Sequence, residues 1–220
     1  MSGPAIRAII GERLRAERRA IAFSCAMAAV AAFIQPHGIA TITNPLTADV
    51  TVRSVWLAGP MFVCSTIGIA LAILQGPGRH TYLDLSERSA PLFGRELARA
   101  KAAAPLIAAT LATLAYWATQ YLTGFAAPPT FFILALASVL ASTLVAMNAT
   151  VRRDTGKSAA IALAAATVVI SYLLALYADP PSPSRSDVVG VTTELAFCAI
   201  VSYIALREYG EALARYDPLA

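Results

Sequence analysis

Fifty consecutive residues, 102–151, contain no charged side chain, and this run constrains the fold more than any other feature of the sequence. A bilayer core about 30 Å thick needs about 20 apolar residues for each helical crossing. The run is long enough for two crossings, at about 102–123 and 129–148. Gly124, Pro128 and Pro129 favour a turn between them, and Pro129 also suits the first turn of the second helix.

Four more runs are neutral or nearly so. They lie at about 20–42, 55–74, 158–178 and 188–206, and only Glu194 interrupts the last one. Apolar residues make up 58 % of the chain, and the mean hydropathy is +0.65. The sequence therefore predicts an all-α integral membrane protein in which residues 1–220 form a single domain with six transmembrane helices.

The basic residues are distributed unevenly between the two predicted faces. All of the 17 lysines and arginines except Arg53 and Arg185 fall in the two termini and in the second and fourth connecting segments. The positive-inside rule places these parts in the cytoplasm, so we expect a multi-pass protein of the cytoplasmic (inner) membrane with both termini inside. This orientation accounts for the net charge of +4, and nucleic-acid binding is not needed to explain it.

The first 19 residues predict a helix that lies on the membrane surface. Ile6, Ile9, Ile10 and Leu14 recur at helical spacing, while most arginines of the segment fall on other faces. A plain basic flank that only sets the topology is the alternative. A cleaved signal peptide is not expected, because five arginines and two glutamates precede the first apolar run.

The sequence contains no recognisable motif for catalysis or cofactor binding. The chain has no glycine-rich phosphate loop ending in Lys-Ser or Lys-Thr, so ATP is not bound by that route. The predicted topology separates His37 from His80, and the three cysteines, Cys25, Cys64 and Cys198, lie inside predicted helices, where apolar packing explains them. We therefore expect no catalytic residue, metal site or cofactor in this chain.

The segment Gln75–Lys101, between the second and third predicted helices, is the most informative polar part of the sequence. It carries seven charged residues from position 84 onward: Asp84, Glu87, Arg88, Arg95, Glu96, Arg99 and Lys101. Ser89 can cap a helix whose first turn contains Pro91, and Glu96 lies one helical step from Arg99. The segment either presents a charged helix to a cytoplasmic partner or is a solvated connector that continues into the third crossing.

The order Pro91, Glu96-Leu97 and Lys101 is similar to the pattern that follows the coupling helix in membrane subunits of type-two ABC exporters. The plan of the whole chain also resembles these subunits, which have an N-terminal interfacial helix, six crossings, both ends inside and a charged coupling helix between the second and third crossings. Phe93 and Gly94 depart from the family pattern, which has Ser-Arg at these positions.

This resemblance implies a transport role in which another chain hydrolyses the ATP. It assigns 75–101 as a cytoplasmic coupling loop that docks on an ATP-binding cassette ATPase subunit, and it implies a second membrane subunit, a copy or a paralogue, that completes the transport path in the lipid bilayer. The coupling residues it indicates are Ser86, Glu87, Arg88, Glu96 and Lys101. The substrate is not indicated.

Other interpretations remain open at this point. A six-span substrate-binding subunit of a vitamin-type importer has a similar size, and a membrane scaffold or a membrane enzyme without a recognisable motif belongs to a different class. Glu194, the one acid inside a predicted crossing, has either a structural role, which includes a re-entrant segment before the last crossing, or a role in contacting the substrate.

Overall fold

The computed structural model describes residues 3–39, 48–74, 94–124, 129–151, 157–177 and 186–215. These residues form seven helices and no strand: α1 (Gly3–Ala16), α2 (Arg18–Ile39), α3 (Ala48–Leu74), α5 (Gly94–Leu122), α6 (Pro129–Val151), α7 (Lys157–Tyr177) and α8 (Ser186–Arg215). The described part of the chain is therefore all-helical, as the sequence predicts.

Three stretches of these helices are long and apolar enough to cross a membrane: Glu96–Leu122, Pro129–Val151 and Gly190–Leu213. Ala58–Leu74 and Ile161–Leu174 are also apolar but shorter within the described residues. Both crossings predicted from the neutral run at 102–151 are among the three. An α-helical membrane protein is thus supported, while the number of six crossings stays a prediction.

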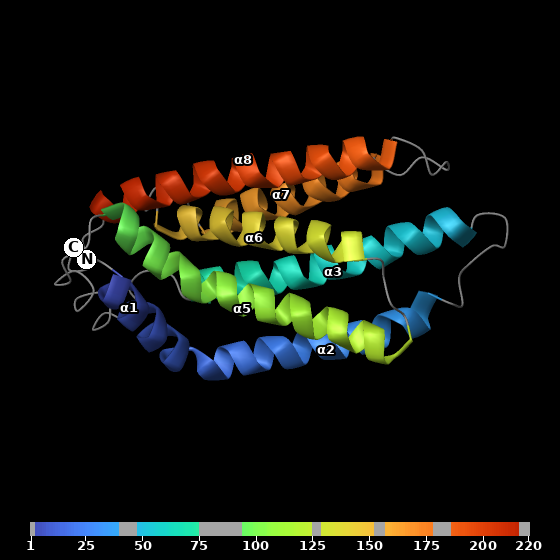
Figure 1. Ribbon diagram of the computed structural model, residues 1–220, viewed down its shortest axis with the longest axis horizontal. Coiled ribbons are helices and arrows are strands. Elements are labelled where there is room, and N and C mark those ends of the chain that lie inside the picture. Colours follow the sequence, from blue (N-terminus) through green and yellow to red (C-terminus); the bar gives the residue numbers. More distant parts are fainter. Residues whose placement is uncertain are drawn as a thin grey trace.

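The six helices from α2 to α8 lie side by side and alternate in direction (Figure 1). α6 is central, because it packs against α3, α5, α7 and α8. α1 lies at the end of the bundle where α5 begins and α8 ends (Figure 1). We call this the basic end, because it holds Arg13, Arg99, Lys101 and Arg207.

Two glycines explain how neighbouring helices connect and approach. Gly124 follows α5 with a φ of 80°, in the turn that the sequence predicts there, and α6 begins at Pro129. Gly68 lies in α3, and a Cβ at this position would collide with the Thr143 hydroxyl of α6. A side chain larger than hydrogen would therefore require the Thr143 side chain or one of the two helices to shift.

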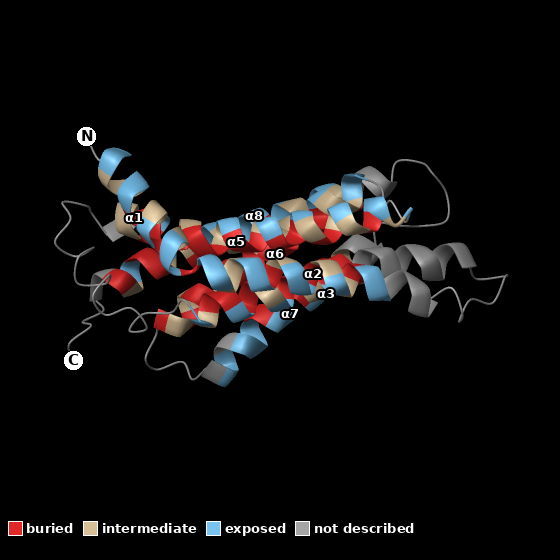
Figure 2. Cartoon of the chain, turned by 90° about the horizontal axis from the view of Figure 1, so that it is seen from below, coloured by how far each residue is buried: buried red, intermediate tan, exposed pale blue. Residues whose placement is uncertain are grey.

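Small residues fill much of the interior, and many large apolar residues lie on the outer faces. Along α5, the alanines at 98, 100, 102, 104, 108, 109 and 112 are all buried. Large apolar side chains on the outer faces of α2 and α7 are exposed, among them Phe23, Ile34, Leu163 and Leu173 (Figure 2). Such faces are expected where a helix bundle contacts lipid or another membrane chain.

Three helices extend beyond the expected bounds, at both ends of the bundle: α3 begins at Ala48, whereas the sequence predicted a crossing that begins at about residue 55. α5 begins at Gly94, so the last part of the charged segment is already helical and continuous with the third predicted crossing. α8 continues beyond residue 206 to Arg215. Its polar extension contains an ion pair one helical turn apart, in which Arg207 Nε lies 3.3 Å from Glu211 Oε1.

The N-terminal helix forms within the predicted segment 1–19. α1 ends at Ala16, and the hydrogen bonds from Glu17 N to Arg13 O and from Ile21 N to Glu17 O, both 3.0 Å, join it closely to α2. Ile9 and Arg13 are its buried residues, and α1 packs on α5. The described structure thus has a helix in this segment, and an interfacial helix at the membrane surface stays a prediction.

Candidate functional site

Glu194 is a fully buried acid in the apolar part of the bundle. Its exposed fraction is 0 %, and the Ser171 hydroxyl of α7 donates a hydrogen bond of 2.7 Å to its Oε1. Cys198, one turn further along α8, places its Sγ 3.9 Å from the same oxygen and 3.4 Å from Ser171 Oγ. The other carboxyl oxygen, Oε2, is buried without a hydrogen-bond partner in the described structure.

The neighbours of this glutamate on α8 explain why it is enclosed. Val191 and Leu195, which flank it, pack with Tyr172 of α7 against a buried cluster that includes Met61 of α3 and Leu134 of α6. A carboxyl group in such surroundings costs free energy unless it is hydrogen-bonded, and here only one oxygen has a close oxygen partner. From its position in the sequence, Glu194 could lie near the membrane interface or in a polar cavity. The structure places its side chain inside the bundle, against α7.

The cluster of Ser171, Glu194 and Cys198 can exchange a proton or hold a hydrogen-bond donor, but it does not resemble a metal site. Within the described residues, no group of three histidine, cysteine, aspartate or glutamate side chains could hold a metal ion. Cys198 was expected only to pack, and the structure adds its contact with the polar pair. No sequence signal pointed to Ser171, because its role depends on the pairing of α7 with α8.

The predicted coupling residues divide into two groups. Ser86, Glu87 and Arg88 lie outside the described residues, and their role stays a prediction. Glu96 and Lys101 both lie near the start of α5 at the basic end, where Glu96 is half-buried and Lys101 is buried. The Lys101 side chain is thus turned into this chain, which leaves Glu96 as the more accessible of the two.

A second polar contact at the basic end was not predicted. Asn148, near the end of α6, donates a hydrogen bond of 2.9 Å from Nδ2 to Glu208 Oε2 of α8. One sequence feature could have indicated this contact: Asn148 is the only asparagine in the neutral run at 102–151. An amide in an otherwise apolar helix commonly hydrogen-bonds to a neighbouring helix.

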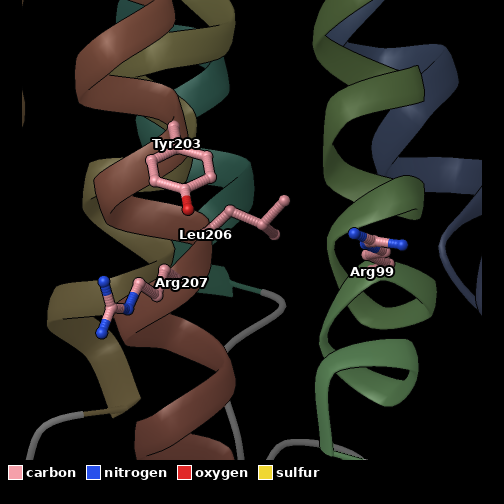
Figure 3. Close-up of a pocket in the computed structure, with 4 residues that line it drawn as sticks. All are labelled: Arg99, Tyr203, Leu206 and Arg207. Atoms are coloured by element: carbon pink, nitrogen blue, oxygen red, sulfur yellow. The ribbon is translucent and has the colours of Figure 1, made fainter.

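A pocket of about 380 Å³ lies between α5 and α8 at the same end of the bundle (Figure 3). Arg99 lines it from α5, and Tyr203, Leu206 and Arg207 line it from α8. In Figure 3, Leu206 points into the gap toward α5, whereas Arg207 points away from α5. The basic end therefore offers two arginines and a tyrosine around one opening, in contrast to the enclosed Glu194.

Comparisons with protein-family models, with curated proteins and with solved structures found no match to this sequence.

Proposed function

We propose that this chain is the membrane subunit of an ATP-driven exporter of the type-two ABC class, in which a separate ATPase subunit docks at the basic end. The observation that carries the proposal is the segregation of charge along the bundle. The ionisable side chains of α1, of the start of α5 and of the end of α8 gather at one end, and between the ends the helices are almost entirely apolar. A machine that receives its energy by contact needs such a polar docking end.

The charged segment before α5 supplies the proposed contact. Residues 84–101 contain seven charged side chains, and the last four of them lie within α5, which is one helix from Gly94 to Leu122. A continuous helix of this kind can transmit movement of a docked partner into the membrane. In this proposal the coupling residues are Ser86, Glu87, Arg88, Glu96 and Lys101, with Lys101 holding the helix within the bundle because its side chain is buried.

The remaining parts of the proposal concern assembly and location. The exposed apolar faces of α2 and α7 support contact with lipid and with a second membrane subunit, either a copy or a paralogue. The chain would lie in the cytoplasmic membrane with the basic end facing the cytoplasm, because basic residues are retained on that side. The transported substrate is not assigned.

Charge reversal in the proposed docking segment tests this function. Glu87→Lys and Arg88→Glu should each abolish most transport and reduce transport-linked ATP hydrolysis, because losing one partner of a desolvated charge pair costs roughly 2–5 kcal/mol. The matched control is Glu12→Lys, a reversal on the exposed face of α1 at the same end, which should retain activity. Purification from the native membrane should also recover an ATPase with the unaltered chain.

Insertion is checked in the same variants with single cysteines. A membrane-impermeant thiol reagent should label Ala126→Cys from outside and leave Asp84→Cys unlabelled. Labelling of the second position from outside would place the proposed docking segment on the wrong side. Recovery of a transmembrane coupling protein would favour the importer subunit, and recovery of no partner would favour the scaffold.

A further inference from the structure

The pocket between α5 and α8 has a chemistry that the proposed transport function does not use. Its lining combines two guanidinium groups, a phenol and one apolar side chain, at the end of an otherwise apolar bundle. This combination is typical of sites at the level of lipid headgroups, where tyrosine and arginine meet both water and hydrocarbon. The following inference depends on the chain being embedded in a membrane and does not depend on ATP-driven export.

The charge of the pocket is positive. Arg99 is exposed and has no hydrogen-bond or ion-pair partner within the described structure. Arg207 is partly compensated, because its Nε lies 3.3 Å from Glu211 Oε1 and both side chains are more than half exposed. Among the other acids at this end, Glu208 accepts a hydrogen bond from Asn148, and Glu96 is a half-buried group with a partner of its own.

Apolar stripes begin beside the two arginines and run toward the opposite end of the bundle. On α5 the exposed residues Ile107, Leu111 and Leu114 follow Arg99 at helical spacing. On α8 the exposed Ile204 and Ile200 lie on the same face as Tyr203 and Arg207. A ligand with a negative headgroup and long apolar chains would match the basic pocket and these stripes together.

The arrangement of the three helices supports the same match. α5 and α8 lie close together at the basic end and diverge toward the other end, with α6 between them (Figure 1). α6 packs against both helices, and its Leu140 is only half-buried. An apolar chain that extends from the pocket over α6 would therefore lie beside the stripe of α5, whereas a second chain would lie on the face of α8 that carries Ile200 and Ile204 and is turned away from α5.

We propose that this pocket binds the phosphate group of an anionic phospholipid from the leaflet at the basic end, with the acyl chains along α5, α6 and α8. Arg99 makes the main contact, since a guanidinium group can donate two parallel hydrogen bonds to a phosphate. Arg207 contributes less, because it is shared with Glu211 and its side chain points away from α5 in Figure 3. The Tyr203 hydroxyl is a further donor at the rim.

Native mass spectrometry of the purified full-length chain tests this site. Phosphatidylglycerol and phosphatidylcholine with identical acyl chains are added to the protein in a mild non-ionic detergent, and the bound lipids are counted. The first lipid should be retained more strongly than the second. Arg99→Gln should weaken phosphatidylglycerol binding about fivefold, which corresponds to about 1 kcal/mol for one arginine near an anionic headgroup.

Matched variants make the result specific. Arg99→Lys should recover part of the binding, because it keeps the charge and loses the paired hydrogen bonds. Arg207→Gln should have a smaller effect than Arg99→Gln. Arg19→Gln, which removes an exposed charge of α2 outside the pocket, should leave binding unchanged. If Arg99→Gln does not yield folded protein, Arg99→Lys and Arg207→Gln against Arg19→Gln decide the question.

Three outcomes would overturn the proposal. Equal retention of the two lipids would show that charge does not select the ligand. An equal loss in Arg19→Gln and Arg99→Gln would show that binding follows net charge and not this pocket. Inorganic phosphate that displaces phosphatidylglycerol at comparable concentration would show that the site takes a soluble anion, with no contribution from the apolar stripes.

Discussion

α8 carries two glutamates that accept hydrogen bonds from neutral side chains of neighbouring helices, and they lie in very different surroundings. Glu194 accepts from Ser171 of α7 at 2.7 Å, and Glu208 accepts from Asn148 of α6 at 2.9 Å. The two acids are 14 residues apart, or about 20 Å along the helix at 1.5 Å per residue. Glu194 is fully buried among apolar residues, whereas Glu208 is half-buried at the basic end.

Because of this difference in burial, we expect the two hydrogen bonds to contribute differently to stability although their lengths are similar. If a side chain around Glu194 is altered, water cannot reach the polar groups that lose a hydrogen-bond partner. The free-energy cost of leaving these groups unpaired is therefore not relieved. Around Glu208, water can reach the altered groups, and the charged residues of the last turns of α8 lie nearby. We therefore expect changes at the buried pair to be costly and changes at the basic end to be tolerated.

The largest expected effect is that of Glu194→Ala. The substitution leaves a cavity in a fully enclosed position and removes the acceptor of the Ser171 hydroxyl, so we expect a loss of about 2–4 kcal/mol in unfolding free energy. Thermal unfolding in detergent, followed by circular dichroism, measures the change. Glu208→Ala is the matched control and should cost less than half as much, because its site is half-open to water. An equal loss in both variants would contradict the proposed role of burial.

A smaller effect is expected for the hydrogen bond itself. Ser171→Ala should lower the unfolding free energy by about 0.6 kcal/mol, and by no more than about 1.7 kcal/mol, the range found for hydrogen bonds between membrane helices. In the double variant with Glu194→Ala, the two losses should not add, because each removes the same contact. Additive losses would show that Ser171 and Glu194 act independently, for example because Ser171 bonds mainly to Cys198.

The all-helical class and the turn at Gly124 could be predicted from the sequence because they depend on local patterns. In a membrane, a neutral run of 50 residues interrupted by Gly124 and Pro129 is expected to form two helices joined by a turn. α5 ends and α6 begins at this turn, as expected. The extension of α8 past residue 206 was missed, because a transmembrane criterion stops at the first charged residue. The ion pair of Arg207 with Glu211 stabilises helix beyond that point.

The polar contacts between helices could not be predicted in the same way. Ser171, Asn148 and Lys101 have ordinary surroundings in the sequence, and their burial or pairing depends on which helices pack together. Glu194 was singled out as an acid in an apolar run, but its full enclosure depends on the packing of α8 against α7. Sequence patterns indicate which residues are unusual, and only the tertiary arrangement shows which of them meet.

The smallest expected effect is that of breaking the surface ion pair on α8. Glu211→Ala should lower the unfolding free energy by about 0.3–0.5 kcal/mol at low salt, and the difference should disappear as the salt concentration rises, because exposed pairs one helical turn apart are weak and screened. Both side chains are more than half exposed, at 62 % and 56 %. Thermal unfolding at two salt concentrations measures the change, and Glu12→Ala on α1 controls for the loss of an acid elsewhere at the basic end. A loss above about 1 kcal/mol that persists in high salt would contradict this prediction. It would mean that Glu211 holds Arg207 in a fixed position. The difference between Glu194 and the basic end would then depend on packing more than on access to water.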